Sequence, residues 1–298
     1  VLELGDVAGH VDGGQTPTSS ATGRVERRPG APAVPSAVMA VDELLELLAA
    51  AAAEVRKALD GLDDWGLAGT RAGQYRSDLA ADEVAFEVLD REGVGVLSEE
   101  SGLHNGDRDL LVVVDPVDGS TNAARGIPWF ATSLCALDDE GPLAALVVNQ
   151  ATGERFEAVR GRGARRNGGP MAPTGCRQLG DALLGLTSVP PQRLGWRQVR
   201  SLGAAALDLC AVACGQLDAY ADWSLYSHGP WDYLGGMLVC LEAGATVADA
   251  LGRDLVARGP SDRRIPVAAA TPELLAEVVA ARTSLGDRLS SGPPPGSA

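Results

Sequence analysis

The stretch Leu110-Leu-Val-Val-Val-Asp-Pro-Val-Asp-Gly-Ser-Thr-Asn122 decides how the chain around it folds. Its first five residues are apolar and three of them are β-branched, which predicts a buried strand that ends at a carboxylate. Asp115 and Asp118 then lie three residues apart across a proline, and a Gly-Ser-Thr sequence follows directly. Two hard oxygen ligands, a flexible backbone position and small donors in one loop are the parts that bind Mg²⁺ and a phosphate group.

The charge of the chain argues against a nucleic-acid partner. The 298 residues include 25 basic and 40 acidic side chains, so the net charge is −15. The phosphate backbone of a nucleic acid would repel such a chain. We therefore expect no nucleic-acid partner, and the charge by itself names no other. A small phosphorylated metabolite is expected as the partner from the motifs described below.

Cysteine usage and hydropathy predict a cytoplasmic protein that is not attached to a membrane. The five cysteines are an odd number and lack CxxC spacing, which favours buried reduced thiols over a zinc or redox site. No apolar run approaches the ~20 residues that span a bilayer. The N-terminal residues also lack the charged and apolar regions of a signal peptide.

Composition divides the chain into one folded domain and two tails. Residues 1–36 are rich in Gly, Pro, Ser, Thr and Ala and predict a disordered N-terminal tail. Residues 285–298 predict a disordered C-terminal tail for the same reason. Between them, residues 37–284 predict one folded domain with two halves, of about residues 37–178 and 179–284.

Within this domain the hydrophobic pattern alternates between helices and strands. Helices are expected over residues 36–62, 80–91, 204–215, 231–243 and 272–281, and strands over 94–97, 110–114, 131–137, 142–149, 154–159, 163–167, 182–187, 219–223, 246–249 and 266–270. Strands and helices interleave without strict βαβ repetition, which predicts a layered α/β fold with mixed sheets.

Carboxylates recur at the ends of these elements. Glu99 follows one strand and Asp115 and Asp118 follow the next, while Asp82 and Asp232 lie near the starts of helices. Each acid alone is typical of a helix cap or a solvated charge. Together they indicate a metal site, because several carboxylates buried near one another are costly without a cation between them.

Three of these motifs resemble the signature motifs of the inositol monophosphatase family. They are Glu99-Glu-Ser, Asp115-Pro-Val-Asp-Gly-Ser-Thr-Asn122 and Trp231-Asp232, which stand in the family's order. The resemblance extends from about Ser36 to Glu277. It implies an αβαβα sandwich, Mg²⁺-dependent hydrolysis of a phosphomonoester and a homodimer.

The resemblance also implies roles for individual residues. The metal ligands carried over by position, for two or three Mg²⁺, are Glu99, Asp115, Asp118, Asp232 and the backbone carbonyl of Val117. Glu99 and Ser120 are expected to activate the attacking water. Asp82 is expected to lie near the Ser120 hydroxyl and to support it without binding the metal. Glu100 is not expected to be a direct ligand.

The expected substrate contacts fall in two segments. The phosphate is expected on Gly119, Ser120 and Thr121, and the alcohol on Gly203, Ala204 and Asp222. Asp222 falls near the family's inositol-contacting glutamate and is one methylene shorter. The roles of the neighbouring His228 and Arg200 stay open, because this is where the sequence departs furthest from the family.

The function expected first is hydrolysis of a phosphate monoester of the inositol 1-phosphate type, that is, an inositol-phosphate phosphatase. Histidinol phosphate and a 3′-phosphoadenosine nucleotide are alternatives within the same chemistry. An alternative from another class is a catalytically silent relative that binds a metal or a protein. A two-metal nuclease uses similar carboxylates, but the acidic balance argues against it.

Overall fold

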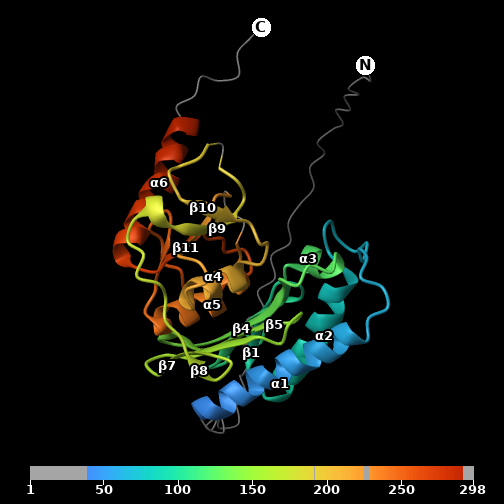
Figure 1. Cartoon of the computed structure of the whole chain (residues 1–298). Coiled ribbons are helices and arrows are strands. Elements are labelled where there is room, and N and C mark those ends of the chain that lie inside the picture. Colours follow the sequence, from blue (N-terminus) through green and yellow to red (C-terminus); the bar gives the residue numbers. More distant parts are fainter. Residues whose placement is uncertain (1–38, 191, 225–227, 291–298) are drawn as a thin grey trace, which may run out of the picture. The chain divides into compact units, whose positions relative to one another are not determined.

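The structure is a computed structural model that describes residues 39–190, 192–224 and 228–290 (Figure 1). The predicted N-terminal tail and residues 291–298 of the predicted C-terminal tail lie outside these ranges. No helix in the described part combines the length and the apolar character that crossing a membrane requires.

The larger of two sheets has eight strands in the spatial order β2-β1-β3-β4-β5-β6-β7-β8. Strands β1 and β3 pair in parallel, and the other neighbours pair antiparallel. The strands are β1 (Gly95–Ser98), β2 (Gly102–His104), β3 (Leu111–Asp118), β4 (Ala131–Asp138), β5 (Gly141–Asn149), β6 (Arg155–Val159), β7 (Gly163–Arg166) and β8 (Gly169–Pro170). Strand β3 is buried along its whole length, as expected for a sheet covered on both faces.

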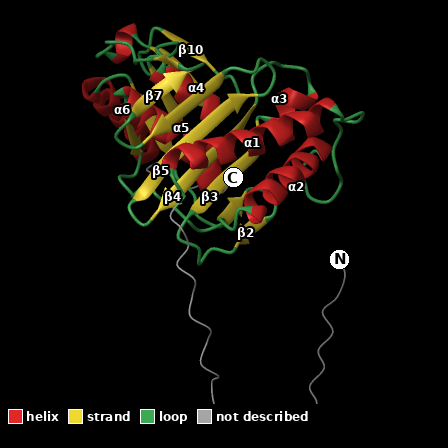
Figure 2. Cartoon of the chain, turned by 90° about the horizontal axis from the view of Figure 1, so that it is seen from below, coloured by secondary structure: helices red, strands yellow, loops and turns green. Residues whose placement is uncertain are grey.

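Helices α1 (Val41–Asp60) and α2 (Arg76–Arg91) cover the outer face of this sheet (Figure 2). In α1, apolar residues recur every three or four positions from Leu44 to Leu59, and this stripe is buried. It forms one hydrophobic core with residues of α2 and with the valines of β3. The opposite face of α1 carries charged side chains and is exposed.

Helices α4 (Ala205–Ala213) and α5 (Pro230–Ala243) form a central layer. All nine residues of α4 are buried, and α5 is buried on nearly every side. Helices that are apolar all round belong inside a protein, between other elements. Accordingly, α5 packs against β3 to β7 of the larger sheet and also against the smaller sheet.

The smaller sheet has five strands in the order β10-β9-β11-β13-β12. They are β9 (Leu183–Thr187), β10 (Gln198–Arg200), β11 (Ala219–Asp222), β12 (Thr246–Asp249) and β13 (Pro266–Ala269). Helix α6 (Pro272–Ser290) packs against β11, β12 and β13. The layers therefore alternate helix, sheet, helix, sheet, helix, and the expected layered α/β fold is confirmed.

Three helix boundaries differ from the predicted ones by four residues or more. Helix α1 begins at Val41 instead of residue 36. Helix α2 begins at Arg76 instead of residue 80, because the Asp78 carboxylate accepts a hydrogen bond from the backbone N–H of Tyr75 (2.8 Å) and so stabilises an earlier start. Helix α6 continues to Ser290 instead of ending at residue 281. In its extension Arg282 is buried and donates to the backbone carbonyls of the segment after β11, a contact that the local pattern does not reveal.

Candidate active site

The site begins at the ends of two parallel strands. Strands β1 and β3 pair with Ser98 opposite Val114, so the acids that follow them, Glu99 and Asp115, emerge side by side. The backbone N–H of Glu99 donates to the carbonyl of Val114 (3.2 Å) and continues the pairing by one residue. The strand register therefore brings together two carboxylates that are sixteen positions apart in the sequence.

A β-bulge then separates Asp115 from Asp118. Asp115 pairs with Ser133 of β4 and Asp118 pairs with Ala131, so three steps along β3 oppose two steps along β4. The bulge contains Pro116, which has no N–H to donate to the ladder. The Asp115 carboxylate accepts from the N–H of Val117 (3.0 Å), which holds it at the turn.

Asp118 and Asp232 are each fixed by a helix start. The Asp118 carboxylate accepts from the backbone N–H of Ala206 (2.7 Å), at the start of α4. The Asp232 carboxylate accepts from the N–H of Gly229 (2.6 Å) and so caps α5, which has Pro230 as its first residue. Asp232 is thus the helix cap that its position suggested, and it has one oxygen left for the site.

Three of the predicted metal ligands converge. Glu99, Asp115 and Asp232 each place a carboxylate oxygen within 4.8 Å of the others. Asp118 is not part of this group of three, since one of its oxygens is held by α4, but it lies close enough for its charge to act on Glu99 and Asp115. Val117, the fifth predicted ligand, lines the adjoining cavity.

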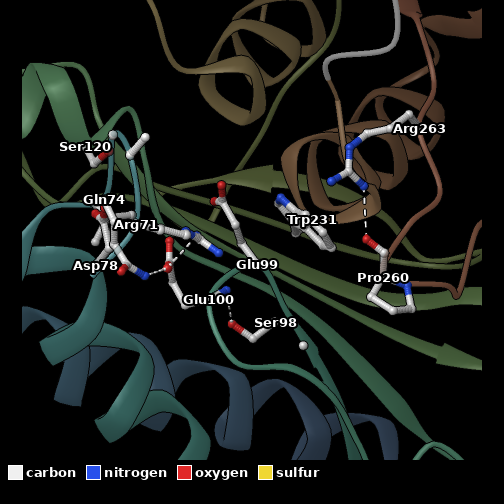
Figure 3. Close-up of a pocket in the computed structure, with 14 residues that line it drawn as sticks. Arg71, Gln74, Asp78, Ser98, Glu99, Glu100, Ser120, Trp231, Pro260 and Arg263 are labelled. Atoms are coloured by element: carbon white, nitrogen blue, oxygen red, sulfur yellow. Dashed lines mark hydrogen bonds and ion pairs between the residues drawn. The ribbon is translucent and has the colours of Figure 1, made fainter. Parts of the chain in front are cut away.

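The cavity beside these carboxylates has a volume of about 420 Å³. Glu99 projects into its centre, between a group formed by Arg71 and Glu100 and a second group formed by Trp231 and Arg263 (Figure 3). The guanidinium of Arg263 stacks over the Trp231 ring at 5.2 Å. The cavity is therefore walled by both halves of the domain.

Burial and the mutual repulsion of the carboxylates raise the pKa values of the acids in this cluster. Burial, and then the charge of Asp232, raises the pKa of Glu99 to about 8. Burial also raises the pKa of Asp118 to about 7 and holds the pKa values of Asp115 and Asp232 above their ordinary value. Carboxylates this close cannot all ionise unless positive charge comes between them.

Glu100, the second acid of its motif, has protein partners instead. It forms an ion pair with Arg71 (2.6 Å) and also accepts from the side chain of Gln74. Its side chain is only 5% exposed, so these donors satisfy it within the protein. This placement agrees with the expectation that Glu100 is not a direct metal ligand.

The structure does not bring Asp82 to the cavity. Because α2 begins at Arg76, Asp78 lies in its first turn and lines the cavity, while Asp82 lies one turn further along. The Asp82 carboxylate accepts from the hydroxyl of Ser98, behind the Glu99 turn, and no hydrogen bond joins it to Ser120. Burial raises the pKa of Asp78 to about 6, as for the other cavity acids.

Sequence reasoning missed Asp78, although a signal was available. Asp78 and Asp82 are one helical turn apart and share a face, so the choice between them depends on where the helix starts. An acid three residues after the N-cap is a start signal. Applied to Tyr75, that rule would have selected Asp78.

Two predicted phosphate and alcohol segments meet at glycines. Gly119 (φ +88°) caps the short helix α3 (Ser120–Ala124), and Gly203 also has a positive φ of +90°. A Cβ on Gly119 would lie 3.0 Å from the Gly203 carbonyl oxygen and 3.2 Å from the Cβ of Ala204. Ser120 lines the cavity, and the hydroxyl of Thr121 lies 3.3 Å from that of Tyr75.

Asp222, the remaining predicted substrate contact, is fully buried and used by the protein. One carboxylate oxygen accepts from the N–H and hydroxyl of Ser224 (2.7 and 2.6 Å), and the other faces Nδ1 of His228 (2.8 Å). Burial alone would raise its pKa, but the hydrogen bonds from His228 and Ser224 outweigh burial and lower it. Asp222 is outside the cavity lining, as are Gly119, Gly203 and Ala204, and Arg200 lies exposed on β10.

The cluster fits a divalent cation. The Glu99 carboxylate has no hydrogen-bond donor among the described residues, and the three converging groups offer hard oxygen ligands. Arg71 is paired with Glu100, and the Nη1 of Arg263 donates to the carbonyls of Pro260 and Asp262. The charges of His228 and Arg263 lower the pKa of Asp232, but burial outweighs them and that pKa stays raised. The carboxylates of Glu99, Asp115 and Asp232 therefore suit a divalent cation such as Mg²⁺.

Comparison with known proteins gives a consistent family. The chain matches the sequence pattern of the inositol monophosphatase family over residues 74–286. The match begins at Gln74, in the wall of the cavity, and includes every motif described above. It leaves out all of α1, which the sequence resemblance had included.

Individual relatives carry two activities in their names. A fructose-1,6-bisphosphatase of Pyrococcus furiosus is 31% identical over 208 residues, which cover 68% of this chain and 80% of the relative. An inositol-1-monophosphatase of Mesorhizobium japonicum is 35% identical over 206 residues, covering 62% and 75%. The structure of an inositol monophosphatase from Anabaena superposes with a TM-score of 0.68 at 27% identity, covering 82% of this chain and 96% of that one.

Proposed function

The chain belongs to the inositol monophosphatase family, and we propose that it hydrolyses a small phosphate monoester of the inositol 1-phosphate type with Mg²⁺ as cofactor. The observation that carries this proposal is the convergence of Glu99, Asp115 and Asp232 within 4.8 Å, beside a cavity that Ser120 also lines. A cytoplasmic homodimer is proposed with it, from the resemblance.

The chain's own groups divide the work of binding and proton transfer. Glu99, Asp115, Asp118, Asp232 and the carbonyl of Val117 would hold the cations. Bound there, Mg²⁺ would neutralise the cluster, polarise the phosphoryl oxygens and lower the pKa of a water.

Glu99 and Ser120 are proposed to act on the attacking water. Glu99 projects into the cavity, and its carboxylate would accept the proton that the attacking water loses, as a general base does. The Ser120 hydroxyl would orient the water toward it. The N–H groups of Gly119 and Ser120 would hold the phosphate, because the first N–H groups of a helix have no partner inside the helix.

The alcohol of the ester is proposed to lie against Gly203 and Ala204. These residues adjoin Gly119, so a leaving group next to the bound phosphate meets them first. Asp222 is not retained in this role, since both of its oxygens have partners inside the protein. Among other esters, fructose 1,6-bisphosphate is the first to test, because the Pyrococcus relative carries that activity in its name.

The test is phosphate release from a panel of esters by the full chain, with Mg²⁺ and with excess chelator. The panel contains inositol 1-phosphate, fructose 1,6-bisphosphate, histidinol phosphate and 3′-phosphoadenosine 5′-phosphate. We expect release with Mg²⁺ only, fastest from inositol 1-phosphate. Full activity in chelator would remove the metal from the proposal, and no release from any ester would leave a silent relative.

A further inference from the structure

The last residue of the opening motif, Asn122, makes a contact that the proposed chemistry does not use. Its side-chain amide donates one hydrogen bond to the carbonyl of Trp129 (2.8 Å) and another to the carbonyl of Leu202 (2.7 Å). Trp129 lies two residues before β4 of the larger sheet, whereas Leu202 lies 80 positions after Asn122, before α4. One NH₂ group therefore ties the two halves of the domain together.

The backbone around this amide leaves no room for another arrangement. Gly119 and Gly203 approach so closely that a Cβ on either would make contacts near 3 Å, and for Gly203 the nearest atom is the Asn122 amide nitrogen itself (3.1 Å). Both residues are in the left-handed region, where glycine is unstrained. The amide thus occupies the space beside Gly203, whereas a Cβ on Gly119 would meet the carbonyl oxygens of Gly203 and Trp129.

Two further contacts join the same segments on either side of Asn122. Asp118 accepts from the N–H of Ala206 (2.7 Å), and the indole N–H of Trp129 donates to Asp208 of α4 (2.9 Å). These bonds anchor α4 itself. Asn122 alone, among the described residues, donates a side-chain hydrogen bond to the Leu202 carbonyl ahead of α4.

We propose that Asn122 is a positioning residue, whose amide sets the distance between the phosphate loop at Gly119 and Ser120 and the segment of residues 202–204 that contacts the leaving alcohol. The proposal rests on the proposed function for the identity of that alcohol, but not for the contact. An amide suits this role because its NH₂ offers exactly two donors to two carbonyls. An aspartate at the same place would lose both donors and would place a carboxylate oxygen against the carbonyl oxygens of Trp129 and Leu202.

The kinetic test compares two leaving groups in Asn122→Ala and Asn122→Asp. For inositol 1-phosphate, whose ring reaches residues 202–204, we expect kcat/KM to fall about 10²-fold, because a displacement of about 1 Å costs that much. For methyl phosphate, whose alcohol is too small to reach them, we expect a change of less than about threefold. The Mg²⁺ concentration for half-activation should stay the same. Equal losses on both esters, or no loss, would overturn the proposal.

Asn149 supplies the matched control. It is a buried asparagine whose amide donates to the Pro128 carbonyl (3.3 Å) and whose oxygen accepts from two N–H groups, all within the larger sheet region. Asn149→Ala should lower the melting temperature without changing the ratio of kcat/KM for the two esters. A changed ratio in this control would show that the readout reports general loosening, and the positioning role would be lost with it.

Hydrogen exchange of the full chain gives a readout that needs no turnover. In both Asn122 variants the amides of residues 203–207 should exchange at least about tenfold faster than in the wild type, since the Leu202 anchor is gone. Asn149→Ala should leave them unchanged. Wild-type protection in both variants would overturn the proposal. If the wild type releases no phosphate, the proposed function fails while this measurement still decides the role of Asn122.

Discussion

Two groups of buried acids in this protein have opposite electrostatics. At the cavity, Glu99, Asp115 and Asp232 have raised pKa values and lie against one another. In and beside the smaller sheet, Asp222 and Asp249 are just as buried, yet their pKa values are lowered. Burial raises the pKa in both groups, so burial does not explain the difference.

The difference lies in the donors that surround each group. Asp249 is paired with Arg253 (2.7 Å) and accepts from the N–H groups of Leu251 and Ile265, and Asp222 has His228 and Ser224. At the cavity, Asp115 and Asp232 each accept one hydrogen bond from a backbone N–H. Glu99 has no hydrogen-bond donor within the described part of the chain. The acids of the smaller sheet thus have donors within the protein, whereas the three acids at the cavity have few. This difference supports the proposal that Glu99, Asp115 and Asp232 bind a cation.

The largest expected effect separates the two groups by function. Asp115→Asn should lower kcat/KM by at least about 10³-fold, because it removes a charged oxygen from the cluster. In chelator its melting temperature should be equal to or above that of the wild type, because a neutral amide is not subject to the burial and repulsion that raise the pKa of the Asp115 carboxyl. Steady-state kinetics and thermal unfolding measure both.

Asp249→Asn is the matched change in the other group. It should keep kcat/KM within about threefold and cost about 2–3 kcal/mol of unfolding free energy, because Arg253 loses its charged partner. If Asp115→Asn kept near-wild-type turnover, Asp115 would belong with the structural acids and the contrast would disappear.

The second prediction concerns pH in the absence of metal. Between about pH 4 and pH 8 the folded protein holds protons on Glu99 and Asp118 that the unfolded chain has released, since their folded pKa values are about 8 and about 7. Folding then binds protons, so the unfolding free energy is highest at low pH and falls as pH rises through this range. The unfolding free energy in chelator should therefore fall from pH 5 to pH 8 by about 1.4 kcal/mol per pH unit for each proton involved. The melting temperature should drop with it.

Mg²⁺ supplies the control for that prediction. Excess Mg²⁺ should raise the melting temperature more at pH 8 than at pH 5, because the cation competes with protons for the same oxygens. A melting temperature in chelator that is flat from pH 5 to pH 8 would contradict the raised pKa values.

The third prediction reverses the sign. The lowered pKa of Asp222 contributes stability above the unfolded pKa near 4, and this contribution is lost as pH falls through the folded pKa. Asp222→Asn should cost about 2 kcal/mol at pH 7, since His228 loses a charged hydrogen bond. Chemical denaturation at pH 7 measures that cost. The half-activating Mg²⁺ concentration should not change.

Substrate preference decides whether Asp222 has a second role. The sequence predicted that it contacts the alcohol, and the structure gives both of its oxygens to Ser224 and His228. The ratio of kcat/KM for inositol 1-phosphate and methyl phosphate should therefore stay constant in Asp222→Asn. An altered ratio with unchanged stability would return Asp222 to the substrate pocket.

The same contrast explains how far the sequence alone could go. The layered fold and the acids at the ends of β1 and β3 were predictable because hydrophobic period and motif order are local properties. The register of Ser98 with Val114 then brings Glu99 and Asp115 together without further information. Asp232 followed from its place at the start of α5.

The choice of Asp82 over Asp78 was a local error. The acid three residues after Tyr75 marks the start of α2, but that start was placed four residues late. Contacts that depend on tertiary packing, in contrast, were not predictable. Asp222 lies where the family's pattern suggests, but only packing shows that His228 occupies its carboxylate. The bond from Asn122 to Leu202 joins residues 80 positions apart, and no local period indicates it.

The smallest expected effect concerns Asp208, which belongs to neither group. Its carboxylate is completely buried, one oxygen accepts from the indole of Trp129 (2.9 Å), and the other has no hydrogen-bond partner among the described residues. Burial raises the pKa of Asp208 well above its usual value, so burial favours the neutral acid over the carboxylate. Asp208→Asn keeps the shape and an oxygen that accepts from Trp129, and it should change the unfolding free energy by less than about 1 kcal/mol. Asp208→Ala, which also removes the bond from Trp129, should cost about 1–2 kcal/mol more. Chemical denaturation at pH 7 compares the three proteins. A loss of 3 kcal/mol or more in Asp208→Asn would mean that Asp208 is ionised and has donors for its charge, as Asp222 and Asp249 do. Glu99, Asp115 and Asp232 would then be the acids that lack such donors, as expected for a metal site.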